Sequence, residues 1–578
     1  MGLNIQRRQP ALDRASFSDA IPPLLQRIYA ARGALADSDC NLSLNKMLPP
    51  TCKGLPDAVA RLVSALEADE RILIVGDFDA DGATSSALGI KVLRAFGARQ
   101  VDFLVPNRFE YGYGLSPEIV AVAAESKPDL IVTVDNGISS LAGVDAANAL
   151  GIDVVVTDHH LPGSELPKAL AIVNPNQPDC PFPSKALAGV GVMFYLLSAL
   201  RAGLAQAGWF ERKGITPPKM ADFLDLVALG TVADVVPLDH NNRILVHQGI
   251  RRIRAGLASP GIYALLEAGK RDPHHLQASD LGFVVGPRLN AAGRLDDMSL
   301  GIRCLLADSG EEARQLAADL DRLNRERREI EQGMQQEALS HLENLQLKVD
   351  ETLPLGITLH DETWHPGVVG LVASRIKERF HRPVIAFAPE DDAVVKGSGR
   401  SIPGVHIRDV LDAVDKRCPG AIIKFGGHAM AAGLSLRRDR LAEFGDVFAA
   451  VIEDMSDPEL FIASLVSDGE LAADDLTEPL AQQLLDAGPW GQHFPEPRFD
   501  GDFLLLNQRI VGEKHLKFVV APLSNPQQAV DAIAFNVDIE QWPNPDVERV
   551  RLYYALDINR FRGNTQLQLM VQSLEAVA

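Results

Sequence analysis

Carboxylates and imidazoles stand directly after several short apolar runs of this chain, where they could bind metal ions. The residues with this placement are Asp77, Asp79, Asp81, Asp135, His159, His160 and Asp234. Oxygen ligands combined with one or two imidazoles suit Mn²⁺ or Mg²⁺ better than a structural zinc site. Two such ions about 3.5–4 Å apart can hold the attacking and leaving oxygens of an in-line attack on phosphorus. The pattern therefore favours a two-metal phosphodiesterase.

The first acidic segment, Asp77-Phe78-Asp79-Ala80-Asp81-Gly82, also matches the opening of a calcium-binding EF-hand loop. The twelfth position of such a loop requires a bidentate glutamate, but Leu88 stands there, and the preceding segment is typical of a strand. These two features exclude an EF-hand. A lone aspartate after an apolar run, such as Asp234, is usually a turn or cap residue. That explanation does not account for the whole set. We interpret the pair His274-His275 as a solvated loop.

The apolar runs that precede these residues are typical of a parallel sheet. Arg71–Gly76 (RILIVG) is a continuous apolar run, and a helix is predicted over 83–96. Further short runs are Val101–Val105, Leu130–Val134, Asp153–Thr157 and, before Asp234, Leu226–Val232, which we count as another strand. Buried runs that alternate with helices indicate a doubly wound α/β sheet, whose ligands bind at the carboxyl ends of the strands. Carboxylates that converge there would repel one another unless cations lay among them.

The length of 578 residues suggests three or four domains. We expect an N-terminal segment over 1–70 that packs on the catalytic domain, an α/β catalytic domain over 71–310, a connecting helix over 311–345, a second α/β domain over 346–455 and a C-terminal module over 461–578. The narrow apolar stripe of the polar helix favours a connecting helix over a coiled-coil dimer. Alternating residues on both sides of Arg562-Gly563-Asn564 predict a hairpin, and the module is expected to be a small oligonucleotide-binding β-barrel.

Composition limits the other possibilities. The five cysteines are scattered, which argues for a reducing compartment and predicts a cytoplasmic protein. No uninterrupted apolar stretch approaches the roughly 18 residues of a membrane span. The net charge of −21 has the wrong sign for simple coating of nucleic acid. Binding of nucleic acid must then rest on metal ions and on local basic clusters such as Arg325–Arg328 and Arg375–Arg382, for which solvated helix faces are an equal alternative.

The order of motifs resembles a known family. VGDFDADGATSS, VDNGIS, TDHH and GTVADVVPL resemble the four motifs of the DHH phosphoesterase superfamily, which is named after Asp158-His159-His160. GPRLNAAGRLDD, HPGVVGLVASRIKERFHRPVIAF, KGSGRS and FGGHAMAAGLSL resemble the RecJ family, a bacterial branch of single-strand-specific exonucleases with a DHHA1 second domain. The similarity runs over nearly the whole chain, including the C-terminal barrel.

The resemblance implies a role for each matching residue. Asp77, Asp79, Asp81, His159, His160 and Asp234 match metal ligands, and Asp135 matches the carboxylate that bridges two Mn²⁺ or Mg²⁺ ions. It implies that catalysis depends most directly on Asp79, Asp81, Asp135, His159 and His160. No ligand position is substituted.

The resemblance also implies positions that hold the DNA strand. These positions are Arg108, Arg288, Asn290, Arg294, Ser398, Arg400, Ser401, Gly427 and His428. The Lys396–Ser401 loop combines backbone freedom with an arginine suited to phosphate, and it is not a Rossmann fingerprint because Ile402 replaces the third glycine. Phe503, Phe518 and Tyr553 of the C-terminal module are candidates for base stacking, although core packing is the commoner role of barrel aromatics.

The expected activity is 5′-to-3′ degradation of single-stranded DNA to 5′-mononucleotides, in DNA repair, mismatch repair and recombination. The family further implies a single-strand DNA-binding protein and a helicase as partners, and we expect a monomer that does not bind membranes. Two alternatives are a DHH phosphodiesterase acting on short oligonucleotides and a catalytically inactive scaffold that grips single strands. The predicted C-terminal barrel argues against a phosphodiesterase of short oligonucleotides, and the unsubstituted metal-ligand positions argue against an inactive scaffold.

Overall fold

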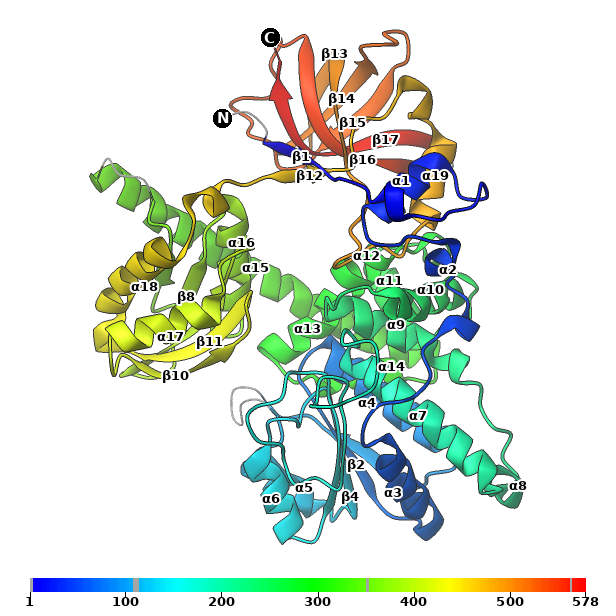
Figure 1. Ribbon diagram of the computed structural model, residues 1–578. Coiled ribbons are helices and arrows are strands. Elements are labelled where there is room, and N and C mark those ends of the chain that lie inside the picture. The colour runs from blue at the N-terminus through cyan, green and yellow to red at the C-terminus, as the bar shows by residue number, and fades with distance from the viewer. Residues whose placement is uncertain (1–3, 108–113, 350–352, 562–563, 578) are drawn as a thin grey trace. The chain divides into compact units, whose positions relative to one another are not determined.

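The computed structural model describes residues 4–107, 114–349, 353–561 and 564–577 (Figure 1). The chain forms two compact units. The first comprises residues 1–321 and 465–578, and the second comprises residues 322–464. The fold is mixed α/β with a closed C-terminal β-barrel, as predicted.

A five-stranded parallel sheet lies at the centre of the catalytic part, with the strand order β3-β2-β4-β5-β6. Its strands are β2 (Ile72–Gly76), β3 (Val101–Leu104), β4 (Leu130–Val134), β5 (Asp153–Thr157) and β6 (Ala171–Val173). Every residue of β2 and β4 is buried, which explains their uninterrupted apolar sequences. One face packs on α5 (Pro117–Glu125) and α6 (Leu141–Ala149) through a shared apolar cluster.

Helices cover the sheet and build the rest of the catalytic part. They are α3 (Leu55–Ala68), α4 (Ala80–Ala95), α7 (Gly189–Gln206), α9 (Leu224–Ala233), α10 (His240–Arg254), α11 (Pro260–Ala268), the π-helix η5 (Leu281–Val285), α13 (Gly286–Leu295) and α14 (Ser299–Leu306). Helix α7 is long and apolar enough to cross a membrane by composition, but 61% of it is buried inside the fold. Among the described residues no other helix has that combination of length and hydropathy.

The prediction of a strand over Leu226–Val232 is wrong. These residues belong to α9, which packs against α4, α7 and α10. Residues 224–231 are all buried. A helix that is apolar on every side has no amphipathic period, so its sequence cannot be distinguished from that of a buried strand.

The N-terminal segment contacts both ends of the first unit. Strand β1 (Ile5–Arg7) pairs in parallel with β12 (Leu465–Ser467) beside the barrel, and Arg32 forms an ion pair with Asp468 at 2.7 Å. Helix α3 packs on α7 and β6 of the catalytic part. The segment is therefore attached to the C-terminal module as well as to the catalytic sheet.

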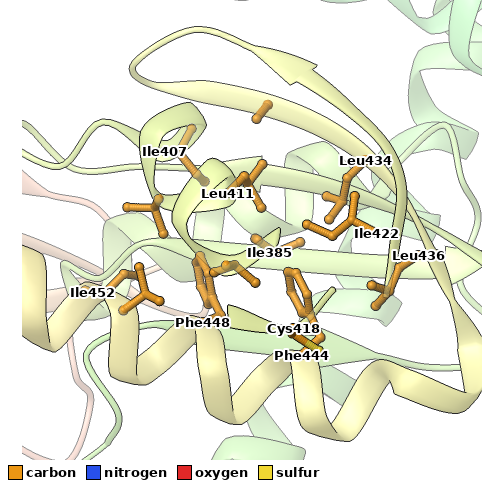
Figure 2. Packing of buried hydrophobic residues seen from close by; sticks show 14 of the residues in the cluster. Ile385, Ile407, Leu411, Cys418, Ile422, Leu434, Leu436, Phe444, Phe448 and Ile452 are labelled. Atoms are coloured by element: carbon orange, nitrogen blue, oxygen red, sulfur yellow. The ribbon is translucent and has the colours of Figure 1, made fainter. Parts of the chain in front are cut away.

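The second unit is a mixed five-stranded sheet with the order β10-β11-β9-β8-β7. Its elements are β7 (Ile357–His360), α16 (Val369–Phe380), β8 (Val384–Pro389), β9 (Val394–Arg400), α17 (Ile407–Arg417), β10 (Ile422–Gly427), β11 (Ala431–Arg437) and α18 (Leu441–Met455). Phe444 and Phe448 of α18 stack on each other and pack toward Ile385 and Leu434 of the sheet (Figure 2). The long helix α15 (Gly310–Val349) precedes this sheet in the chain.

The C-terminal module is a closed barrel with the strand order β13-β14-β15-β17-β16. Its strands are β13 (Phe499–Val511), β14 (His515–Pro522), β15 (Val530–Ala534), β16 (Arg549–Phe561) and β17 (Asn564–Ala576). Pairing of β16 with β17 confirms the predicted hairpin, although Arg562 and Gly563 of its turn lie outside the described residues. Phe503, Phe518 and Tyr553 are all buried, so of the two roles that the sequence left open, base stacking and core packing, they have the second.

Candidate metal centre

The register of the sheet brings three ligand segments to one edge. Gly76 of β2 lies opposite Val134 of β4, and Val134 lies opposite Thr157 of β5. The residues that follow these strand ends, Asp77, Asp135 and Asp158, must therefore emerge side by side. Asp135 follows the central strand in the left-handed conformation, with φ 61°, which aspartate tolerates better than most residues.

The first acidic segment joins β2 to α4. Asp79 caps α4, because its Oδ1 accepts hydrogen bonds from the backbone N–H groups of Asp81 and Gly82 at 2.9 and 3.0 Å. Asp81 is buried, and its two oxygens accept the N–H groups of Gly189 and Val190, at the start of α7, at 2.6 and 2.9 Å. A Cβ atom on Gly189 would lie 2.7 Å from Cβ of Asp135. Only glycine at position 189 therefore allows the start of α7 to lie this close to Asp135.

The histidine segment is held by carboxylate and amide side chains. Oδ1 of Asp158 lies 2.8 Å from Nδ1 of His160 and also accepts the backbone N–H groups of His159 and His160. Its Oδ2 accepts the N–H of Ile138 at 2.9 Å. Asn174 and Asn176 donate to the carbonyls of His160 and His159. Sequence reasoning used Asp158 only as part of a motif, but the structure makes it the residue that orients both histidines.

Asp234 reaches the same place from the C-terminal end of α9. Its Oδ2 lies 3.5 Å from Nε2 of His159, and that nitrogen lies 3.1 Å from Oδ1 of Asp135. The predicted ligands fall into three groups whose ligand atoms lie within 4.8 Å of one another. The groups are Asp135 with His159 and His160, Asp81 with His159 and Asp234, and Asp77 with Asp79 and Asp135. All seven predicted ligands thus converge.

Electrostatics favour cations at this site. Burial, followed by the charges of neighbouring aspartates, raises the pKa values of Asp81 and Asp135 well above the ordinary range. Burial also raises the pKa of Asp234. Asp234 Oδ2 and His159 Nε2 are buried and, despite lying 3.5 Å from each other, neither forms a hydrogen bond among the described residues. Because a bound cation would lower these pKa values and give both atoms a partner, the donor set fits Mn²⁺ or Mg²⁺.

Asp158→Asn should reduce turnover by about 10- to 100-fold, the usual effect of losing a group that orients a metal ligand. Burial opposes protonation of His160, but its hydrogen bond to Asp158 and the charges of Asp158 and Asp234 raise its pKa to about 9. The substitution should therefore also lower the pKa of His160, which NMR titration of the metal-free protein would measure. Asp145→Asn, on the exposed side of α6, is the control. Equal turnover in the two variants would contradict the orienting role.

The structure places three of the predicted strand-binding residues on α13. Asn290 accepts the N–H of Ala80 at 2.8 Å and so supports the acidic segment. Arg288 is buried and forms an ion pair with Asp321 at 2.9 Å, an arrangement that favours a structural role. Arg294 lies in the last turn of α13. Arg108 lies outside the described residues.

The second unit gathers the other strand-binding candidates at one end of its sheet. Arg400 pairs with Ala431, and Gly427 pairs with Ala432, so β9 and β10 flank β11 there. The Arg400 guanidinium donates to Oγ of Ser398 at 2.9 Å and has no carboxylate partner among the described residues. His428, beside Gly427, is exposed, whereas Ser401 is buried and donates to the Val405 carbonyl.

Three arginines of the two basic clusters contact protein groups. Glu331 of α15 accepts from Arg327 and, at 2.9 Å, from Arg375 of α16. Arg382 donates to the carbonyls of His381 and Phe461. These contacts indicate that Arg327, Arg375 and Arg382 mainly stabilise the second unit.

Comparisons with known proteins agree with this arrangement. Family models match residues 71–231 (DHH family, N-terminal domain), 352–454 (DHHA1 domain) and 467–573 (RecJ OB domain). A single-stranded-DNA-specific exonuclease RecJ from Dickeya dadantii is 58% identical over 98% of both chains. The same-named protein of Escherichia coli is 56% identical, also over 98% of both. The crystal structure of RecJ in complex with Mn²⁺ from Thermus thermophilus is 30% identical, with a TM-score of 0.77, over 98% of this chain and 80% of that one.

Proposed function

Because the chain belongs to the RecJ family of single-stranded-DNA-specific exonucleases, we propose that it removes nucleotides from single-stranded DNA by hydrolysing phosphodiester bonds. The observation that carries this proposal is the convergence of seven carboxylates and imidazoles at the carboxyl ends of the catalytic strands. That constellation is complete, which disfavours an inactive scaffold.

The proposed site would hold two Mn²⁺ or Mg²⁺ ions, with ligands from Asp77, Asp79, Asp81, Asp135, His159, His160 and Asp234. When bound, such ions polarise a phosphodiester and neutralise the charge that develops during in-line attack. Asp135 belongs to two of the three ligand groups, which supports its assignment as the bridging carboxylate. Asp81 already accepts hydrogen bonds from two backbone N–H groups of α7, so it also holds the start of α7 beside the site.

We propose that the strand is degraded from its 5′ end and yields 5′-mononucleotides. A 5′-terminal phosphate carries more negative charge than an internal one and can be recognised by charge-assisted hydrogen bonds. Arg400 suits this task, because its half-buried guanidinium lies beside Ser398 without a carboxylate partner among the described residues. Arg108, Arg294, Gly427 and His428 complete the proposed strand-binding set, with Arg288, Asn290 and Ser401 supporting it from within the fold.

The direct test is the release of label from one oligonucleotide carrying it at either end, with and without Mn²⁺. The expected result is early release of the 5′ label, only with metal, and little cleavage of the same sequence as a duplex. Early release of the 3′ label would contradict the polarity. Cleavage of dinucleotides but not of longer strands would support a short-oligonucleotide phosphodiesterase instead.

Arg400→Ala should reduce the preference for a 5′-phosphorylated strand by roughly 10- to 100-fold, since a charge-assisted hydrogen bond contributes about 1.5–3 kcal/mol. Competition between phosphorylated and unphosphorylated strands measures that preference. Arg417→Ala is the matched control, because Arg417 is an exposed arginine of the same unit paired with Asp454. If Arg400→Ala discriminated as well as the control, the 5′ phosphate would have to be recognised elsewhere.

The cellular setting follows from the proposed activity. Removal of single strands from an end is a step of DNA repair, mismatch repair and recombination, and we propose that the protein acts in the cytoplasm as a monomer. Contacts with a single-strand DNA-binding protein and with a helicase stay predictions, to which we assign no described residue.

A further inference from the structure

A polar pocket lies in the first unit, between the catalytic part and the C-terminal module. It has a volume of about 70 Å³. The catalytic part contributes Arg254, at the end of α10, His274 and His275 of the 3-10 helix η4 (Pro273–His275), and Gln277. The C-terminal module contributes Gln482 and Asp486 of α19 (Glu478–Asp486) and Arg560 of β16. None of these residues belongs to the metal centre.

The lining holds more basic than acidic side chains, in contrast to the chain as a whole. The chain has a net charge of −21, yet two arginines and two histidines face this pocket against one carboxylate, Asp486. Two guanidinium groups disfavour a metal cation as the occupant. The pair His274-His275, which the sequence suggested was merely solvated, contributes to the rim of this pocket.

Arg560 is the most available of these groups. Its guanidinium donates to Oε1 of Gln482 at 2.7 Å, and it has no carboxylate partner among the described residues. Its position near the end of β16 leaves it exposed. A guanidinium with several remaining donors is suited to an oxyanion, which it can contact through two parallel hydrogen bonds.

Neighbouring side chains contact Asp486, the one carboxylate of the pocket. Gln482 donates to Oδ2 of Asp486 at 2.9 Å while accepting from Arg560, and Arg254 lies 3.8 Å from Oδ1 of the same carboxylate. With its amide oriented to satisfy both neighbours, Gln277 accepts from Arg254 and donates to the Leu485 carbonyl. The single acid is therefore engaged, while the basic groups on the rim face the pocket.

We propose that this pocket binds a phosphate group of the DNA strand while its end is being degraded. The inference rests on the proposed function. A phosphodiester fits because it is small, carries a negative charge and accepts from several donors, and phosphate contacts supply most of the sequence-independent affinity for a strand. The pocket lies between the two parts of the unit that are expected to touch DNA.

The test compares Arg560→Gln and His275→Gln with Arg551→Gln. Arg551 is an exposed arginine of the same strand, paired with Asp502 at 2.7 Å, so the control makes the same charge change outside the pocket. Binding of a long fluorescent oligonucleotide is measured by anisotropy over a range of salt, without catalytic metal. Turnover of a dinucleotide, too short to span two sites, is measured with Mn²⁺.

Arg560→Gln should weaken binding of the long strand about fivefold at 0.1 M salt and reduce the salt slope by about 0.7, the value for one phosphate contact on a single strand. His275→Gln removes an imidazole from the rim and should weaken binding in the same direction, and Arg551→Gln should match the wild type. Dinucleotide turnover should be unchanged in all three. If the pocket variants bound the long strand as the control does, the inference would be overturned, whereas an inactive wild type would refute the proposed function instead.

Inorganic phosphate separates a strand from a free anion as the source of the phosphate. Phosphate should shift the NMR signals of His274 and His275 in the wild type, and the long oligonucleotide should shift the same signals. A response to phosphate alone, with normal strand binding by Arg560→Gln, would assign the pocket to a free anion and overturn the proposal.

Discussion

Asp135→Asn should yield a folded protein whose turnover is at least about a thousandfold lower than that of the wild type. Charge stabilisation by the metal pair is worth several kcal/mol in the transition state, and each 1.36 kcal/mol corresponds to a tenfold change in rate. Asp135 directly follows the central strand and belongs to two of the three ligand groups. Asparagine is preferred to alanine as the replacement, because it tolerates the φ of 61° at this position.

The same substitution should make the metal-free protein more stable. Burial and the nearby charges of Asp81, Asp79 and Asp234 raise the pKa of Asp135, so its ionised form is disfavoured in the fold. Removing that charge should raise the melting temperature of the metal-free protein. It should also reduce the further rise in melting temperature that Mn²⁺ causes. Thermal unfolding with and without Mn²⁺ measures both effects, with Asp145→Asn as the control. A folded variant that kept a tenth of wild-type turnover would show that Asp135 is not the bridging ligand.

The convergence of the ligands was predictable because it depends only on strand order and polarity. Strands β2 and β4 are short buried runs followed at once by a ligand, and β5 is followed by Asp158 and then by the ligands His159 and His160. Parallel strands bring such ends to one edge. Asp234 was predicted to join these ligands from the end of a strand, but it follows the helix α9 instead. The uniform apolar sequence before it gives no period, and its helical state follows from packing against α4, α7 and α10.

The residues that orient the ligands could not be identified from sequence, because orientation depends on contacts between distant segments. Asn290 supports Ala80 across 210 positions of the chain, and Gly189 and Val190 bind Asp81 across more than 100. Asp158 was visible in the motif, but its bonds to His160 and Ile138 appear only once the loop is folded. Arg288 likewise has a half-buried partner, Asp321, that no local pattern indicates.

Removal of divalent metal should abolish cleavage, and Mn²⁺ or Mg²⁺ should restore it while Ca²⁺ should not. The site offers carboxylates and imidazoles in close groups, which suits ions that hold tight octahedral geometry. Ca²⁺ is larger and takes a looser shell, so it would misplace the reacting groups. Nucleotide release after exhaustive chelation and stepwise addition of each ion measures this dependence. Full activity in chelator, or with Ca²⁺ alone, would contradict a two-metal site.

The metal-free protein should lose stability as pH rises, and metal should remove most of that loss. Asp81, Asp135 and Asp234 have folded pKa values above the ordinary aspartate value of about 3.9, so the folded state holds protons that the unfolded chain releases. Stability from these groups is present at low pH and is lost as pH rises through their folded pKa values. His160, with a pKa of about 9, acts in the same direction between its ordinary value of about 6.5 and 9. Because bound Mn²⁺ requires ionised carboxylates and neutral imidazoles, its stabilising effect should grow over the same range. Melting temperatures across pH, with chelator and with Mn²⁺, should therefore diverge toward alkaline pH, and parallel curves would show that these groups do not bind the metal.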